Sequence, residues 1–251
     1  MKFLFVVLIP SLLFIGCVKE KVVKYDSTIL ENYLEENSTL SSAELIACAG
    51  GNNTSFMGSQ EFPIGIFFYP INGACEFRCY ETEDVNVDPN DFSNYTLQSY
   101  SVSDLFGGKL KKFNHPTSFN EKWVMVTYKT LGKIHKCNPI RIKASVSPTN
   151  DISNVIVVTE SGVNPSFNWE NDNEPNNVIF FSVVSDEQDD FVSGTYTYDQ
   201  FWTFYDLSNV VLNITESTPV LQANSSYYYT MMGVSVDNWV HSMAMKKFVT
   251  P

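Results

Sequence analysis

The chain has 251 residues, with 28 acidic and 16 basic side chains, and its formal net charge is −12 at pH 7. A surface of that sign repels phosphate backbones and anionic lipid headgroups, which excludes nucleic-acid binding and electrostatic attachment to a membrane. Aromatic residues make up 14% of the chain and charged residues only 18%, a composition that favours β structure over helix.

The first sixteen residues have the features of a secretory signal peptide. Lys2 is their only charge, and an apolar run from Phe3 to Ile15 follows it. A helix that spans a membrane needs roughly 20 residues, and this run is shorter. A positive start, a short apolar core and a small residue before the cut predict that residues 1–16 are removed on export.

The residues at the predicted cut, Phe14-Ile15-Gly16-Cys17, resemble the lipobox of bacterial lipoproteins. The resemblance implies that Cys17 becomes the new N-terminus and carries several acyl chains, which supply the second signal that stable anchoring needs. The alternative is a plain signal peptide with an incidental cysteine. The membrane, reached through the lipid, is therefore the first expected partner.

Residues 17–42 are predicted to be a lipidated tether that contains one short helix. Leu30 and Tyr33 belong to a set of apolar residues at helical spacing between Ser27 and Asn37, and Ser27 is a candidate N-cap. A polar run follows, which favours a loop.

The first domain is predicted to cover residues 43–147. The segment Cys75–Glu81 alternates, with its two cysteines and the phenylalanine between them on one face. Residues Lys122–Thr130 and Lys133–Lys143 form the clearest hairpin, turning at Gly132. Short strands separated by turn residues indicate a β-sandwich.

A small, polar stretch broken by Pro148 marks the domain boundary, and residues 148–251 are predicted to form the second domain. Its expected strands lie around Trp169 and at Val178–Val184, Val210–Ile214 and Tyr227–Val236.

Leu221, Ala223 and Tyr227 resemble the tyrosine corner of fibronectin type III domains, with alanine where proline is usual. The resemblance covers about 100 residues. It implies that the Tyr227 ring packs under a strand corner while its hydroxyl bonds upstream backbone. The expected fold is therefore all-β, with two β-sandwich domains of the immunoglobulin or fibronectin III kind after the signal peptide and tether.

Taken whole, the lipobox, the tether and the two β modules resemble uncharacterised cell-envelope lipoproteins of the Bacteroidota type. The resemblance implies an outer-membrane location and brings no catalytic residues. Only Glu20 supplies the acidic signal that sends some of these proteins to the cell surface, so surface and periplasmic orientations both stay open.

Four cysteines remain after Cys17, an even number for an oxidising compartment, and all are disulfide candidates: Cys48, Cys75, Cys79 and Cys137. On one regular strand Cys75 and Cys79 are about 13 Å apart, too far for a bridge between them. We therefore expect each to pair with Cys48 or Cys137, with the choice left open. Buried free thiols are the alternative.

Acidic clusters are the best candidates for a cation site, because calcium takes six to eight oxygen ligands. Five carboxylates in loops expected to be neighbours form this candidate: Glu170, Asp172, Glu174, Asp186 and Asp189. The alternative is a set of solvated acidic loops. The chain contains no EF-hand loop. Calcium is the one possible cofactor that the sequence suggests, and the predicted function requires no cofactor.

The aromatic segment between Tyr196 and Tyr205 has two interpretations. Alternation buries about half of its rings in the core or at the domain interface, which is the favoured one. Trp202 and Tyr205 could instead stack on sugar faces.

The chemistry of catalysis is missing from the sequence. The three histidines, His115, His135 and His241, are scattered, although His135 and Cys137 share a strand face and could touch one metal. None of the familiar metal, nucleophile or phosphate-loop motifs occurs. The predicted function is a non-enzymatic interaction or accessory module of the cell envelope. A carbohydrate-binding lipoprotein that serves glycan uptake is the alternative, and an undetected secreted hydrolase is the third.

Overall fold

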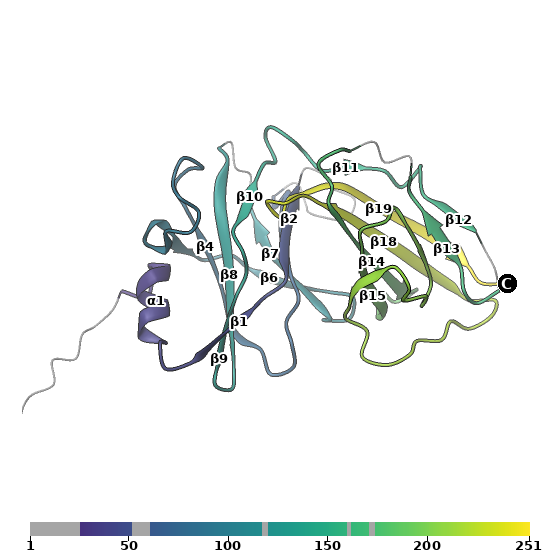
Figure 1. The fold of residues 1–251 in the computed structure, drawn as a ribbon, viewed down its shortest axis with the longest axis horizontal. Helices are drawn as coiled ribbons and strands as arrows, with labels where there is room; N and C mark the ends of the chain where they lie inside the picture. Colours follow the sequence, from purple (N-terminus) through teal and green to yellow (C-terminus); the bar gives the residue numbers. More distant parts are fainter. Residues whose placement is uncertain (1–25, 52–60, 117–119, 160–161, 171–173) are drawn as a thin grey trace, which may run out of the picture.

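The computed structural model describes residues 26–51, 61–116, 120–159, 162–170 and 174–251. Within them, one α-helix accompanies nineteen strands arranged in four sheets, so the predicted all-β, β-sandwich class is confirmed. Figure 1 shows two modules side by side, with α1 at one end and the C-terminus at the other. We call them the first module (26–147) and the second module (148–251). The predicted signal peptide and Cys17 lie outside the described residues.

The first module consists of two facing sheets. The outer sheet has the order β1 (Ser41–Glu44), β9 (Lys133–Lys136), β8 (Lys122–Thr130), β4 (Cys75–Glu81) and β5 (Thr96–Gln98), with β10 (Ile140–Ile142) also paired to β8. The inner sheet has the order β2 (Ala47–Gly51), β3 (Ile64–Phe68), β7 (Leu110–His115) and β6 (Val102–Leu105). The predicted hairpin is confirmed, because β8 and β9 pair antiparallel around Gly132, whose φ of +73° suits glycine.

The predicted alternation of β4 is broken near its start. Glu76 has a φ of +54°, and the register against β8 shifts between Cys75 and Arg78. This bulge leaves Cys75 exposed while Cys79 is buried. The prediction that both cysteines line one face is therefore wrong.

The segment predicted to be a tether is part of the first module from residue 26 onward. Helix α1 (Leu30–Glu36) confirms the predicted short helix, but Ile29 occupies its N-cap position instead of Ser27. Leu30 and Tyr33 are fully buried against the outer sheet, and β1 then pairs parallel with β9. A free tether through residue 42 is thus wrong, because its apolar helix face packs into a core. Among the described residues, none of the helices is long and apolar enough to cross a bilayer.

The second module also has two facing sheets. The large one has the order β11 (Asn150–Asp151), β19 (Val240–Val249), β18 (Ser226–Val234), β14 (Ile179–Asp186), β15 (Phe191–Thr197) and β17 (Val210–Asn213). The small one consists of β12 (Val157–Thr159), β13 (Ser166–Asn168) and β16 (Phe201–Thr203). Trp169 follows β13 and lies fully buried between them.

The tyrosine corner is present at the start of β18. The Tyr227 side chain is buried, and its hydroxyl accepts a hydrogen bond from the backbone N–H of Gln222 at 2.9 Å. Tyr229, two residues further along β18, shares a buried hydrogen bond of 2.8 Å with the Ser182 hydroxyl on β14. Its ring stacks on Phe167 with 3.9 Å between ring centroids.

The four sheets form one stack, because an apolar layer lies between the inner sheet of the first module and the large sheet of the second. We call it the middle layer. Neighbouring residues on β3 and β14 point to opposite faces, so each strand serves two layers. Ile66 and Phe68 pack inside the first module, whereas Phe67 faces the second. Phe180 packs inside the second module, whereas Phe181 faces the first. This middle layer explains why both strands are buried on both sides.

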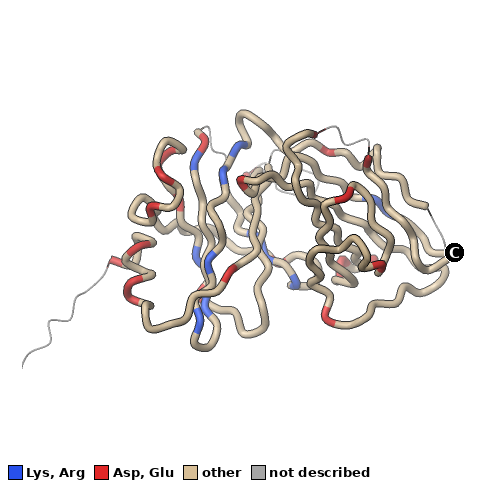
Figure 2. Tube along the Cα trace, viewed as in Figure 1, with Lys and Arg blue, Asp and Glu red and all other residues tan. Residues whose placement is uncertain are grey.

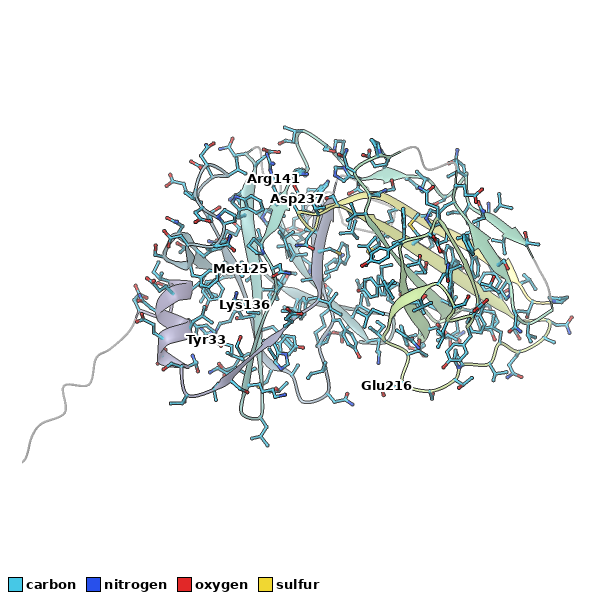
Figure 3. All side chains as sticks on the ribbon, in the orientation of Figure 1. Tyr33, Met125, Lys136, Arg141, Glu216 and Asp237 are labelled. Carbon is cyan, nitrogen blue, oxygen red and sulfur yellow. The ribbon has the colours of Figure 1, made fainter. Side chains whose placement is uncertain are left out.

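The turn between β18 and β19 enters the first module. Trp239 is fully buried in the first module's core, and its indole N–H donates to the Ser147 carbonyl at 2.8 Å. The Asp237 carboxylate pairs with Lys143 at 2.5 Å, and its carbonyl accepts from the Arg141 N–H. Figure 3 shows Asp237 beside Arg141 where the modules meet. The joint is therefore specified by both apolar and polar contacts.

Candidate functional site

The acidic residues predicted to share a calcium ion are not brought together. Glu170 and Glu174 precede β14, whereas Asp186 ends it and Asp189 follows it, and eight residues of strand span roughly 23 Å. The Asp186 carboxylate accepts the backbone N–H groups of its own turn, and Asp189 bonds the Ser185 hydroxyl. Asp172 lies outside the described residues. The shared site is wrong, and the part of the chain described holds no cluster of three candidate metal ligands.

The proposed glycan-stacking pair is not an exposed platform. Trp202 is fully buried, its ring stacks on Phe167, and its N–H donates to the Asp206 carbonyl. Tyr205 is half-buried and packs against the same core. The favoured core interpretation of this segment therefore applies to Trp202, which cannot reach a ligand.

The four candidate disulfide cysteines are all free thiols. Cys79 and Cys137 flank Val126 from the strands on its two sides, which puts them roughly 10 Å apart. A disulfide needs Cα atoms within about 7 Å. Burial raises the pKa of the Cys137 thiol to about 11.

The pair of His135 and Cys137 does not form a metal site. The His135 ring stacks on Tyr128, and its two nitrogens face the Thr130 hydroxyl and the Glu44 carbonyl. The Cys137 sulfur accepts the N–H of Val126. These contacts use the groups that a metal would need.

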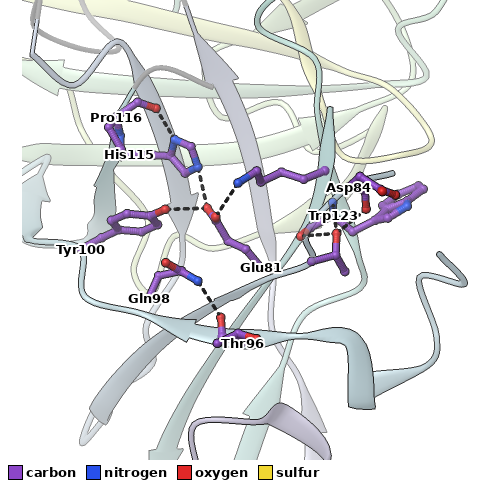
Figure 4. Close-up of polar contacts among 10 residues, drawn as sticks. Glu81, Asp84, Thr96, Gln98, Tyr100, His115, Pro116 and Trp123 are labelled. Atoms are coloured by element: carbon purple, nitrogen blue, oxygen red, sulfur yellow. Dashed lines mark hydrogen bonds and ion pairs between the residues drawn. The ribbon is translucent and has the colours of Figure 1, made fainter. Parts of the chain in front are cut away.

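The structure brings together a different polar cluster at one end of the first module. Glu81 ends β4, Lys122 begins β8 and His115 ends β7, while Tyr100 lies between β5 and β6. The antiparallel pairing of β4 with β8 places the first two side by side. Because β7 belongs to the facing sheet, the cluster closes the end of the sandwich. Figure 4 shows three side chains that converge on the Glu81 carboxylate.

Each oxygen of the Glu81 carboxylate is engaged. Oε1 accepts the Tyr100 hydroxyl at 2.8 Å and lies 2.5 Å from Nε2 of His115, and Oε2 lies 3.0 Å from the Lys122 ammonium. The other His115 nitrogen lies 2.5 Å from the Pro116 carbonyl. Both ring nitrogens of His115 thus face an oxygen atom.

Burial and the neighbouring charges shift the pKa of Glu81 in opposite directions. Burial acts to raise the pKa of the Glu81 carboxyl, but the hydrogen bond from His115 and the charges of His115 and Lys122 outweigh it and hold that pKa below its ordinary value. Burial and the adjacent Glu81 charge raise the pKa of the Tyr100 hydroxyl. Glu81 and His115 are only 4% and 2% exposed, so an unpaired charge there would be costly.

A polar pocket of about 510 Å³ lies beside the cluster. Its lining is rich in hydrogen-bond acceptors: Glu81, Glu83, Asp84, Asn94, Thr96, Gln98 and Tyr100. Lys122 is the single cation of the lining, and its ammonium is bound to Glu81. We call this the Glu81 pocket. Its chemistry suits the binding of hydroxyl or amino groups.

Sequence reasoning missed this pocket, although one signal was present. Phe77, Cys79 and Glu81 alternate, so the carboxylate occupies a position that the pattern assigns to the core face. A charge at a core position is rarely buried unless it is paired. Its partners come from strands that are distant in sequence, so the pattern alone could not name them.

Comparisons with known proteins give no family for the chain. No protein-family model and no curated protein sequence matches it. Among solved structures, it is similar to the chicken interferon gamma receptor alpha chain, with 12% identity and a TM-score of 0.24, over 82% of this chain and 98% of that chain. It is also similar to a segment of titin, with 10% identity and a TM-score of 0.25, over 82% of this chain and 67% of that chain. At such TM-scores the likeness carries no argument about function.

Proposed function

We propose that the chain is a lipid-anchored, non-enzymatic interaction module of the bacterial cell envelope, whose partner contacts the Glu81 pocket. The observation that carries the proposal is the buried Glu81 carboxylate, held by three donors at the wall of an acceptor-rich pocket. A non-enzymatic role is supported by the same contacts, because the ionisable groups of the cluster bind one another.

The pocket points to a partner that offers hydrogen-bond donors. A photo-crosslinking residue at Gln98, inside the pocket, should form a discrete adduct in intact cells. The matched control is the same residue at Val220, which is 68% exposed in the second module. Asp84→Lys should abolish the Gln98 adduct by charge reversal at the pocket rim. Equal labelling at both positions, or no effect of Asp84→Lys, would contradict the proposal.

The membrane location is tested separately through the lipid. The proposal places Cys17 in the outer membrane with acyl chains, supported by the lipobox-like residues before it. Cys17→Ser should release the protein from the membrane fraction and remove the acyl mass. Cys75→Ser, at an exposed thiol, is the control and should leave both unchanged. Unaltered membrane retention of Cys17→Ser would count against the anchor.

Carbohydrate binding is the second candidate, and the amide and carboxylate lining of the Glu81 pocket favours it, since these groups bind sugar hydroxyls. Glycan-array binding should be lost in Gln98→Ala and retained in Tyr205→Ala, which lies in the second module. Binding lost only in Tyr205→Ala would move the site away from the pocket.

A further inference from the structure

A second cavity lies in the middle layer, between the two modules. It has a volume of about 190 Å³, and both modules supply its wall. Phe67 and Leu110 line it from the inner sheet of the first module, and Phe181, Met232 and Val234 line it from the large sheet of the second. Apolar cavities at domain interfaces are common sites for small molecules.

Protein side chains do not fill this cavity, and its lining is poorly suited to holding water. A buried water needs two to four polar partners, and the wall is mainly apolar. A cavity of about 150 Å³ lined by apolar side chains holds a benzene molecule. The present volume is slightly larger, so a single ring with a small substituent fits.

The polar groups at the wall restrict the chemistry of the occupant. Cys48 brings a thiol and Tyr196 a phenol, whereas the amide of the third polar residue, Asn238, donates to the Pro139 carbonyl. The Tyr196 ring stacks on Phe181 with 4.4 Å between centroids, which fixes one face of the cavity. Burial raises the pKa of the Cys48 thiol to about 12 and that of the Tyr196 hydroxyl as well. These surroundings disfavour a charged ligand and can accommodate one hydroxyl.

One side of the cavity reaches the edge of the large sheet. Leu212 lines it from the edge strand β17 and is 41% exposed. A ligand can therefore enter without separation of the modules. From these observations we propose that the cavity between the modules binds a small, uncharged, monocyclic molecule with one hydroxyl group.

The test uses p-cresol as the probe and benzoate as the charged comparison, on the full chain carrying Cys17→Ser and Cys75→Ser. Binding of p-cresol in equilibrium dialysis should saturate at a single site, and a roughly tenfold excess over its dissociation constant should raise Tm. Benzoate should do neither. Absence of a saturable effect, or equal binding of benzoate, would overturn the proposal.

Variants separate the cavity from other apolar surface. Ala47→Leu and Val234→Leu add carbon atoms at the cavity wall and should abolish the p-cresol-dependent rise in Tm. Val211→Leu, at a 46% exposed position beside Leu212, is the matched control and should keep it. If both filling variants fold and still bind p-cresol, the site is elsewhere. Asp84→Lys should not affect p-cresol, so this result is independent of the Glu81 pocket.

Discussion

Tyr227 and Tyr229 lie two residues apart on β18, and each hydroxyl has one defined partner. We expect Tyr227→Phe and Tyr229→Phe each to lower the free energy of unfolding by about 1–3 kcal/mol, because the first leaves the Gln222 N–H and the second the buried Ser182 hydroxyl without its partner. Tyr228 points to the opposite face and is half-exposed, so Tyr228→Phe should change stability by less than about 0.5 kcal/mol. Urea denaturation of the three variants measures the difference. If Tyr227→Phe lowers the free energy of unfolding as little as Tyr228→Phe does, the hydroxyl of the tyrosine corner does not stabilise the fold.

The Glu81 carboxylate makes stability depend on pH in a definite direction. Its pKa in the folded chain is lowered, so its contribution is fully present above the ordinary glutamate pKa and is lost as pH falls through the folded pKa. The groups that face it are Tyr100, His115 and Lys122. In urea titrations between about pH 3 and pH 7, Glu81→Gln should be less stable at neutral pH and should lose less on acidification.

The matched control for this pH dependence is Glu83→Gln. Glu83 is exposed and lies two residues from Glu81 at the rim of the same pocket. This variant should keep the stability and the acid sensitivity of the parent chain. A Glu81→Gln chain that loses stability on acidification as steeply as the parent would show that the carboxylate is not the source.

At the scale of the elements, the turn between β18 and β19 holds the two modules together. Trp239→Ala removes a fully buried indole from the first module's core and the hydrogen bond to Ser147. We expect a loss of about 3–5 kcal/mol in unfolding free energy. Val236→Ala, at an 83% exposed position in the same turn, should change it by less than about 0.5 kcal/mol. A mild Trp239→Ala effect would mean that the turn docks only loosely.

Local patterns predicted the elements better than their partners. The β8–β9 hairpin follows from two strand-forming runs around Gly132, and the short helix follows from the spacing of Leu30 and Tyr33. The spacing in the helix does not indicate which surface the helix covers. In the structure its apolar face packs on the outer sheet. The bulge at Glu76 has no local signal in the sequence. The Glu81 cluster depends on pairings between distant strands, so it could not be derived from spacing.

At the scale of the whole molecule, the charges are divided unequally between the modules. Residues 148–251 contain 13 acidic residues and only two basic ones, Lys246 and Lys247. Figure 2 shows that most lysines and arginines lie in the first module. Helix α1 and the C-terminus lie at opposite ends of the stack. An anchor attached before α1 would place the acidic second module far from the membrane, where repulsion from anionic headgroups is weakest.

The stack of four sheets also decides how the second module behaves alone. Its own core, with Trp169 and the tyrosine corner, is complete without the first module, and residues 148–251 contain no cysteine. A chain of these residues should therefore unfold cooperatively, with the same midpoint with and without reductant. The face of the large sheet that carries Phe181 and Met232 would be exposed, however, because the inner sheet normally covers it. Exposed apolar patches of this kind promote association.

We therefore expect this chain to have a lower urea midpoint than the full protein and to self-associate on a sizing column. Phe181→Ser and Met232→Ser together should restore a monomer, because they place polar groups on the exposed face. Val220→Ser, at a position already 68% exposed, is the control and should leave the association unchanged. A monomeric chain with the midpoint of the full protein would show that the middle layer adds nothing to stability. A transition that depends on reductant or lacks cooperativity would instead argue against the boundary near residue 148.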